Sequence, residues 1–163
     1  MLPVLNENAP DVFMDAIPKI KCPFVVSDGT ALGLYREGDF IKGDSDIDIA
    51  IIFYKGVDQD VKEWLHGYEC FREIWKDGKL SQLAFLKDGV IFDTYYHYKK
   101  GKNYTNKNEE NQMTIMPCYL YDKPTLFKTK YGVVPMPSDI EEYLVRRYGD
   151  DWMIPSKKKV TFQ

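Results

Sequence analysis

The sequence contains few of the residues that build metal-binding modules. Its 163 residues include only three cysteines and two histidines. Cys22, Cys70 and Cys118 form no Cys-x-x-Cys pair, and neither His66 nor His97 lies near a cysteine pair. We therefore expect no structural zinc site. The odd number of cysteines favours free thiols in a reducing cytoplasm.

Long apolar runs and a strong charge of one sign are also missing. No stretch approaches the roughly 18 apolar residues of a membrane-spanning helix, and the N-terminus lacks the pattern of a signal peptide. The net charge of -3 provides no strong field that would attract nucleic acid. We expect a cytoplasmic protein without a transmembrane segment, working at a membrane surface if at all by peripheral contact, and without a nucleic acid partner.

The composition is that of an ordinary globular domain, with 15% aromatic and 29% charged residues. There is no internal repeat and no low-complexity linker, so we expect one domain over residues 1–163. A chain of this length can bury roughly two-thirds of its unfolded surface in a core.

The pattern of apolar residues and turns predicts a mixed fold. Strands are expected within residues 22–26, 45–54, 70–75, 80–86, 89–98 and 113–121. Helices are expected within residues 6–20, 30–36, 58–69 and 138–149. Asp-Gly pairs predict tight hairpins, and residues 99–112 resemble a solvated loop. Ser138 and Glu141 have the spacing of a capping box, and Gly149 is expected to end the last helix. The predicted class is α/β (α+β), a mixed sheet with flanking helices.

The stretch "DSDIDIAIIF" places aspartates directly before an apolar strand. Residues two apart in a strand point to the same face, so Asp46 and Asp48 share one side and Ile47, Ile49 and Ile51 the other. Two neighbouring carboxylates repel each other unless a cation neutralises them. Oxygen ligands without cysteine or histidine favour Mg²⁺ or Mn²⁺, and Mg²⁺ also binds substrate phosphates.

A third carboxylate is needed to complete a site with two metal ions. Asp93 is the best candidate, because it also lies within an apolar strand pattern, "VIFDTYY". We expect a neighbouring antiparallel strand to bring it beside Asp46 and Asp48. His97 shares the predicted face of Asp93, and is either a partly buried sheet histidine or a contact of the acceptor substrate.

A glycine-led turn before a helix provides donors for an anion. The N–H groups of Gly29 and Thr30 can point at a phosphate, supported by the positive end of the helix dipole. Arg36 could bind phosphate oxygens with two donors, or could form an ordinary surface ion pair. Asp44 is either a hydrogen-bond acceptor behind the site or a loop residue.

Together, these residues resemble the active-site signature of the nucleotidyltransferase fold and, more narrowly, of the LicD/fukutin family. The block "GTALGLYREGDFIKGDSDIDI" is similar to that family's "GTLLGxxRxxGFIPWDDDIDI". The later block "VPMPSDIEEYLVRRYGDDWMIP" resembles a second family block, in the same order along the chain. Gly43 and Ser45 depart from the pattern, which has tryptophan and aspartate there, so the shape of the pocket is expected to differ.

The resemblance implies a phosphotransferase that moves a phospho-alcohol group, such as phosphocholine or ribitol phosphate, from a CDP-linked donor to a glycan hydroxyl. It implies that Asp46, Asp48 and Asp93 bind two divalent ions, Mg²⁺ or Mn²⁺, and carry out catalysis. Asp93 would also help to deprotonate the acceptor. The other matching residues, which would bind the donor, are Gly29, Thr30, Arg36 and Asp44.

Two other functions fit the same carboxylates. One is a minimal nucleotidyltransferase, which moves a nucleotide from a nucleoside triphosphate to a small molecule, a protein or RNA. The other is a catalytically silent module that binds a nucleotide. The intact aspartates disfavour the silent module, and the C-terminal block favours the CDP-linked donor.

Overall fold

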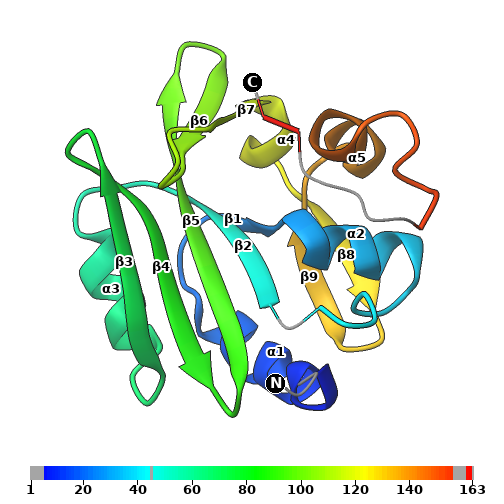
Figure 1. The fold of residues 1–163 in the computed structure, drawn as a ribbon, viewed down its shortest axis with the longest axis horizontal. Coiled ribbons are helices and arrows are strands. Elements are labelled where there is room, and N and C mark those ends of the chain that lie inside the picture. The colour runs from blue at the N-terminus through cyan, green and yellow to red at the C-terminus, as the bar shows by residue number, and fades with distance from the viewer. Residues whose placement is uncertain (1–5, 45, 156–160, 163) are drawn as a thin grey trace.

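The computed structural model describes residues 6–44, 46–155 and 161–162, so Ser45 lies outside the described residues. The chain forms short α-helices around one large sheet, as Figure 1 shows. The α-helices are α1 (Ala9–Ala16), α2 (Asp28–Arg36), α3 (Val57–Trp64), α4 (Tyr119–Asp122) and α5 (Ile140–Tyr148). Two 3₁₀ turns flank α1, at Asn6–Asn8 and Ile17–Lys19.

Nine strands form two sheets within the described residues. They are β1 (Phe24–Val26), β2 (Asp46–Ile52), β3 (Glu69–Lys76), β4 (Lys79–Lys87), β5 (Val90–Lys100), β6 (Asn103–Lys107), β7 (Met113–Pro117), β8 (Thr125–Thr129) and β9 (Gly132–Met136). The large sheet has the order β1-β2-β5-β4-β3, with β6 pairing β5 and β7 pairing β6. The strands β8 and β9 form a separate hairpin. The prediction of a mixed sheet with flanking helices is confirmed.

The strand β2 lies inside the sheet because its apolar residues need cover on both sides. Ile47, Ile49 and Ile51 are fully buried in the core, as the alternation of the sequence predicts. β2 pairs antiparallel with β1 and parallel with β5. The expectation that the Asp93 strand runs antiparallel to the Asp46 strand is therefore wrong. β5 is antiparallel to β4 instead, and the long connection after β2 allows a parallel return.

The two Asp-Gly turns connect β3 to β4 and β4 to β5, as predicted. Asp77, Gly78, Asp88 and Gly89 all have positive φ angles between 49° and 77°. This is the backbone of the two-residue hairpin turns for which Asp-Gly is preferred. The expected loop 99–112 is wrong in part, because β5 extends to Lys100 and Asn103–Lys107 is a strand. Its polar residues pair with β5 and β7 through the backbone, which composition does not reveal.

The helix α5 begins one residue later than the capping box predicted. Asp139, and not Ser138, is the N-cap residue, and its carboxylate accepts a hydrogen bond from the N–H of Glu142. The hydroxyl of Ser138 donates instead to the carbonyl of Tyr119. Gly149 ends the helix with a positive φ of 94°, as predicted.

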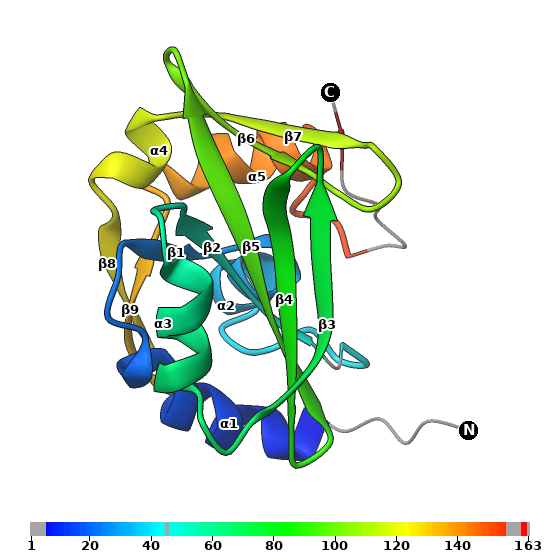
Figure 2. The same ribbon diagram turned by 90° about the vertical axis from the view of Figure 1, so that its left-hand side faces the viewer.

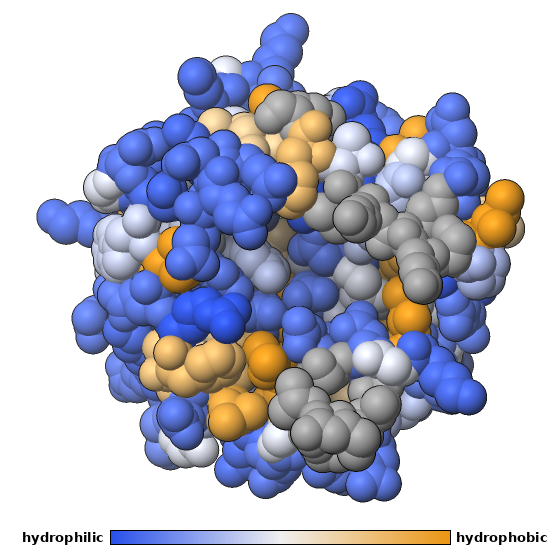
Figure 3. Space-filling view, in the orientation of Figure 1, coloured by the Kyte–Doolittle hydropathy of each residue, from blue (hydrophilic) through white to orange (hydrophobic). Residues whose placement is uncertain are grey.

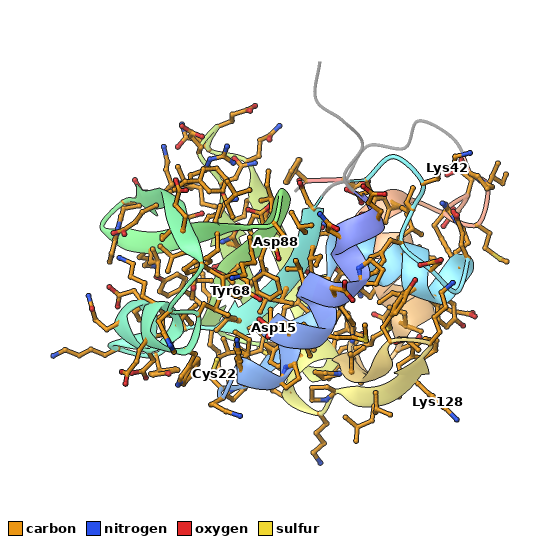
Figure 4. The ribbon with its side chains drawn as sticks, turned by 90° about the horizontal axis from the view of Figure 1, so that it is seen from below. Asp15, Cys22, Lys42, Tyr68, Asp88 and Lys128 are labelled. Atoms are coloured by element: carbon orange, nitrogen blue, oxygen red, sulfur yellow. The ribbon has the colours of Figure 1, made fainter. Side chains whose placement is uncertain are left out.

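The helices lie around the sheet at different places (Figures 1 and 2). The helix α3 lies beside the β3–β4 hairpin, while α2 and α5 lie next to each other at the other end of the sheet. Seen from below in Figure 4, Tyr68 reaches α1, where its hydroxyl donates a 2.6 Å hydrogen bond to Asp15. The core is continuous through these elements, from Phe13 in α1 to Leu144 in α5.

Two predictions that rest on absences can be compared with the described residues. All three cysteines are free, in agreement with the expectation of unpaired thiols. In the part of the chain that the structure describes, no helix combines the length and the apolar character needed to cross a membrane.

Candidate active site

The centre of the site is formed by the aspartates of the two parallel strands. In the register of β2 and β5, Asp48 lies directly opposite Asp93. Asp46 is two residues before Asp48 and therefore points to the same face of the sheet. Asp48 is 7% and Asp93 3% exposed, which is unusual for carboxyl groups. The structure thus brings the three predicted carboxylates to one face, through a strand pairing that the sequence did not predict.

These carboxylates line a cavity of about 430 Å³. Its walls come from β2, β4, β5, the start of α2, the segment after β6, and α5. Gly29 and Asp44 also line it, so five of the seven predicted site residues meet there. The face seen in Figure 3 is mostly hydrophilic and is hollowed near its centre.

Burial and neighbouring negative charges raise the pKa values of Asp48 and Asp93. Burial and then the charges of Asp28 and Asp93 raise the pKa of Asp48 well above its ordinary value. Burial and then the charge of Asp46 raise the pKa of Asp93 to about 6. Gln82 partly offsets this, because its amide donates a 2.7 Å hydrogen bond to Oδ1 of Asp93. A cluster in which burial and like charges oppose ionisation attracts cations.

Gly29 leaves room for the carboxylates, as a glycine in a binding loop often does. A Cβ atom at this position would lie 2.8 Å from Oδ2 of Asp44 and 3.9 Å from Oδ2 of Asp48. A contact of 2.8 Å is too close for any side chain to be tolerated without movement. The carboxylates of Asp44 and Asp48 therefore converge on the backbone at the start of α2.

Thr30 and Asp44 support the strand of aspartates through the backbone. The buried hydroxyl of Thr30 accepts a 2.9 Å hydrogen bond from the N–H of Asp48. Oδ1 of Asp44 accepts one of 3.2 Å from the N–H of Asp46. Thr30 does not line the cavity. Its observed contact orients Asp48, which is different from the predicted contact of its own N–H with phosphate.

Arg36 is not brought to the cavity. Its guanidinium donates to the carbonyl oxygen of Trp152 and to the carboxylate of Glu37. It therefore joins the end of α2 to the segment after α5, which is a structural role compatible with the surface ion pair considered from the sequence. Arg72 of β3 lines the cavity instead, and its charge lowers the pKa of Asp93. Arg72 forms no ion pair with another described residue.

An ion pair between Asp28 and Arg147 was missed in the sequence. The Nε of Arg147 donates to Oδ1 of Asp28 over 2.6 Å, and the N–H of Asp28 donates to the hydroxyl of Tyr143. Burial opposes ionisation of Asp28, but the attraction of Arg147 outweighs it and keeps its pKa below the ordinary value. Because 119 positions separate the partners, only the tertiary structure shows the pair.

One signal in the sequence could have pointed to Arg147. It follows Tyr143 and Leu144 at the spacing of one helix face, where a buried arginine needs a carboxylate partner. The pair joins α5 to the start of α2, and both residues line the cavity. The C-terminal block thus contributes directly to the wall of the site.

His97 lies deeper in the same cavity, on the face of β5 that carries Asp93. It is 5% exposed, and its ring stands edge-on to Tyr121 with centroids 5.3 Å apart. Burial lowers its pKa to about 4, so the imidazole is neutral at neutral pH. Its Nδ1 is buried without a hydrogen-bond partner in the described part of the chain. The expectation of a sheet histidine is confirmed, although the side chain is fully rather than partly buried, and a contact with the acceptor stays a prediction.

The donor set suits a hard divalent cation. Asp46, Asp48 and Asp93 offer oxygen atoms only, which Mg²⁺ and Mn²⁺ prefer. The raised pKa values of Asp48 and Asp93 indicate that a neighbouring cation would stabilise their ionised forms. Within residues 6–44, 46–155 and 161–162, no three acidic, histidine or cysteine side chains already stand in the arrangement of a metal site. The chemistry of the three side chains fits such an ion.

Comparison with known proteins identifies similar sequences. The chain is 29% identical over 148 residues to human ribitol-5-phosphate transferase FKTN, and 30% identical over 168 residues to the mouse protein. These alignments cover 85% and 94% of the chain, but only 31% and 35% of the relatives, so the chain spans about a third of their length.

A solved structure and a family model complete the comparison. A "putative nucleotidyltransferase" from Thermotoga maritima has a TM-score of 0.53 and 15% identity, covering 88% of this chain and 83% of its own. This similarity shows the fold alone. The family model for the LicD/FKTN/FKRP nucleotidyltransferase domain matches residues 21–137, which include Gly29 and all three site aspartates. Since that match extends over most of the chain, the protein belongs to the LicD/FKTN/FKRP nucleotidyltransferase domain family.

Proposed function

We propose that this domain transfers a phospho-alcohol group, such as ribitol phosphate or phosphocholine, from a CDP-linked donor to a glycan hydroxyl. The observation that carries the proposal is the pairing of Asp48 with Asp93 across two parallel strands inside a cavity. Membership of the LicD/FKTN/FKRP family and similarity to proteins named ribitol-5-phosphate transferases support the choice of the transferred group. The three free thiols suit a reducing compartment, so a cytoplasmic location is part of the proposal, and peripheral contact with a membrane stays a prediction.

Asp46, Asp48 and Asp93 would hold two divalent ions, Mg²⁺ or Mn²⁺. When bound, such ions offset negative charge on the diphosphate of the donor and on the attacking and leaving oxygens. The carboxylates suit this role because they are held on strands, where their backbone cannot move away from one another. The hydrogen bond from the N–H of Asp48 to Thr30 adds to that restraint.

The remaining residues of the site have separate tasks. Gly29 has no side chain and so leaves room for the carboxylates of Asp44 and Asp48 at the start of α2. Arg72 offers a guanidinium to phosphate oxygens from the opposite wall. The ion pair between Asp28 and Arg147 keeps α5 against the site.

Asp93 would receive the proton of the attacking hydroxyl. Gln82 donates to its Oδ1 and so orients the carboxyl group, which leaves Oδ2 for the acceptor. The acceptor oxygen then attacks phosphorus in line with the departing CMP, and its proton passes to Oδ2 of Asp93.

The test is incubation with CDP-ribitol, CDP-glycerol and CDP-choline in the presence of Mn²⁺ and a glycan acceptor. Release of CMP from one donor supports the proposal, and transfer to the glycan should be visible by mass spectrometry. Asp48→Asn should abolish release, whereas Asp88→Asn should not, because Asp88 is an exposed turn residue with a φ of 49° that asparagine adopts readily. Release of diphosphate from a nucleoside triphosphate, with no CMP from any donor, would identify a nucleotidyltransferase instead.

A further inference from the structure

A second cavity of about 430 Å³ lies near the turn of the β3–β4 hairpin. Figure 2 shows β6 and β7 crossing beside the ends of β3 and β4, and residues of all these strands and of β5 line the cavity. Four of the lining residues are lysines and one is an aspartate. The lysines are Lys76, Lys79, Lys100 and Lys107. We call this hollow the lysine cavity.

The charges around the lysine cavity are only partly balanced. Lys107 pairs with Asp77, with Nζ 2.9 Å from Oδ2. Lys76, Lys79 and Lys100 form no ion pair with another described residue. Several ammonium groups around one concave surface repel one another and raise the local concentration of anions. The cavity therefore has the electrostatics of an anion-binding site.

The floor of the lysine cavity is held in place by hydrogen bonds. The amide of Asn106 donates to the carbonyl oxygens of Ser81 and Tyr96, at 3.0 and 2.9 Å. The hydroxyl of Ser81 donates to the carbonyl oxygen of Lys107 at 2.5 Å, and that of Tyr98 to Leu80 at 2.8 Å. These bonds cross-link β4, β5 and β6, so the concave shape does not depend on a ligand. A preformed floor lowers the entropic cost of binding.

Polar groups beside the lysines suit a sugar. Asn103 and Thr105 add polar side chains to the lining. The ring of Tyr98 stacks on Phe53, with centroids 4.5 Å apart, and lies under Lys79, with Nζ 5.2 Å from the centroid. Hydroxyl and amide groups with a cationic rim together match a saccharide that carries an oxyanion. A lipid surface would need a convex face with apolar side chains around the charges, and this site is concave.

The lysine cavity adjoins the active-site cavity. Asn106 and Lys107 belong to β6, and Asn106 lines both hollows. Tyr98 and Lys100, however, lie on the face of β5 opposite to Asp93 and His97, so opposite faces of this strand line the two cavities. No residue of the predicted catalytic set lines the lysine cavity.

We propose that the lysine cavity binds an oxyanion, a phosphate ester or a carboxylate, carried by a saccharide. The lysines supply the charge that attracts the oxyanion, and the polar side chains beside them contact the sugar. This binding goes beyond the proposed function and does not rest on it.

The test is a titration of the isotope-labelled protein by NMR, which needs no turnover. The probes are glucose 6-phosphate, glucuronate and glucose, together with vesicles of phosphatidylserine or of phosphatidylcholine alone. We expect both charged sugars to shift amide signals of residues 76–81 and 98–107, and glucose to leave them unchanged. Lys100→Glu should weaken binding about tenfold, because it replaces an attraction with a repulsion.

Lys99→Glu is the matched control. Lys99 precedes Lys100 in β5, is also exposed, and points to the other face of the strand. It should leave the affinity for glucose 6-phosphate within about twofold of wild type. Equal effects of the two substitutions would indicate general charge attraction and overturn the proposal.

Two further outcomes would also overturn it. One is that charged sugars shift only signals of the active-site cavity, or none. The other is that phosphatidylserine vesicles, and not the sugars, bind in a manner that depends on Lys100, which would make the cavity a site for lipid headgroups. Absence of CMP release with normal sugar binding would instead refute the proposed transfer reaction and leave the lysine cavity standing, so the two failures are distinguishable.

Discussion

Two cavities of the same volume, about 430 Å³ each, lie on either side of Asn106 with opposite charge. The active-site cavity is lined by seven carboxyl groups and two arginines, and the lysine cavity by four lysines and one aspartate. The difference shows two ways to attract anions. Buried carboxylates held on strands can bind a phosphate only through cations, whereas lysines on long side chains attract an anion directly.

The two cavities also differ in how much their charged groups destabilise the fold. The carboxylates of Asp48 and Asp93 are almost completely buried, and their mutual repulsion lowers the free energy of unfolding. Lys79 and Lys100 are exposed, so water screens them and they cost the fold little. Neutral substitutions of the carboxylates in the active-site cavity should therefore lower activity strongly and raise stability. Substitutions of the exposed lysines in the lysine cavity should change stability little.

The largest effect is expected for Asp48→Asn. Turnover of the CDP-linked donor should fall by about 10³-fold or more, because the proposed metal ions would contribute several kcal/mol to stabilising the transition state. In the presence of EDTA, the same variant should unfold at a higher temperature than wild type, since it removes a buried like charge. Lys100→Met should change neither the unfolding temperature nor CMP release from the donor in water. A lower unfolding temperature for Asp48→Asn without metal would contradict the comparison.

The next effect concerns pH and separates Asp93 from Asp77. The pKa of Asp93 is raised to about 6, so its contribution to the stability of the folded metal-free protein is complete below the unfolded value of 3.8 and is lost as the pH rises to about 6. Relative to Asp93→Asn, the wild type should lose about 3 kcal/mol of unfolding free energy over this range. Urea unfolding in EDTA from pH 4 to pH 7 measures it.

Asp77, in the lysine cavity, should titrate in the opposite direction. Its hydrogen bond with Lys107 and then the charge of that lysine lower its pKa. Its stabilising effect is therefore present above the unfolded value and is lost as the pH falls. Carboxyl ¹³C chemical shifts should place the midpoint of Asp77 below, and that of Asp93 above, the ordinary value of an aspartate. Titration midpoints that both lie above, or both lie below, the ordinary value of an aspartate would contradict the surroundings assigned to these two residues.

A smaller effect distinguishes the two arginines. Arg72→Ala should raise KM for the donor about tenfold, in keeping with the loss of a charged hydrogen bond to phosphate of roughly 1.5–3 kcal/mol at most. Arg36→Ala should leave KM nearly unchanged and lower the unfolding temperature, because Arg36 joins α2 to the carbonyl of Trp152. Steady-state kinetics and thermal unfolding of both variants measure this, and a KM effect confined to Arg36 would restore the role predicted from the sequence.

The smallest effect is expected for the neutral variants of the lysine cavity. Lys79→Ala or Lys100→Ala should weaken the binding of glucose 6-phosphate about threefold and leave KM for the donor unchanged, because single exposed charges contribute up to about 1 kcal/mol. The effect should shrink as salt is raised to 0.5 M. NMR titration with glucose 6-phosphate and with glucose measures it, and a change in donor KM would show that the two cavities do not act separately.

The sequence alone predicted most of the local structure, for reasons that act over short distances. Alternation placed Ile47, Ile49 and Ile51 on the buried face and Asp46 and Asp48 on the other, and the Asp-Gly pairs predicted both hairpin turns. The β6 strand was missed because polar strands have no apolar alternation. The motif "GT...DID" predicted the family, and the family match confirms that prediction.

Only the tertiary structure decided which distant residues meet. In the structure, Asp93 lies opposite Asp48 on a parallel strand, and Asp28 pairs with Arg147. Arg36 lies outside the cavity, where it contacts Trp152, and Arg72 lines the cavity instead. A single sequence carries no signal for such pairs, because strand order and helix packing depend on the free energy of the whole core. The sequence by itself indicated the candidate carboxylates, and long-range packing determined which of them lie together in one cavity.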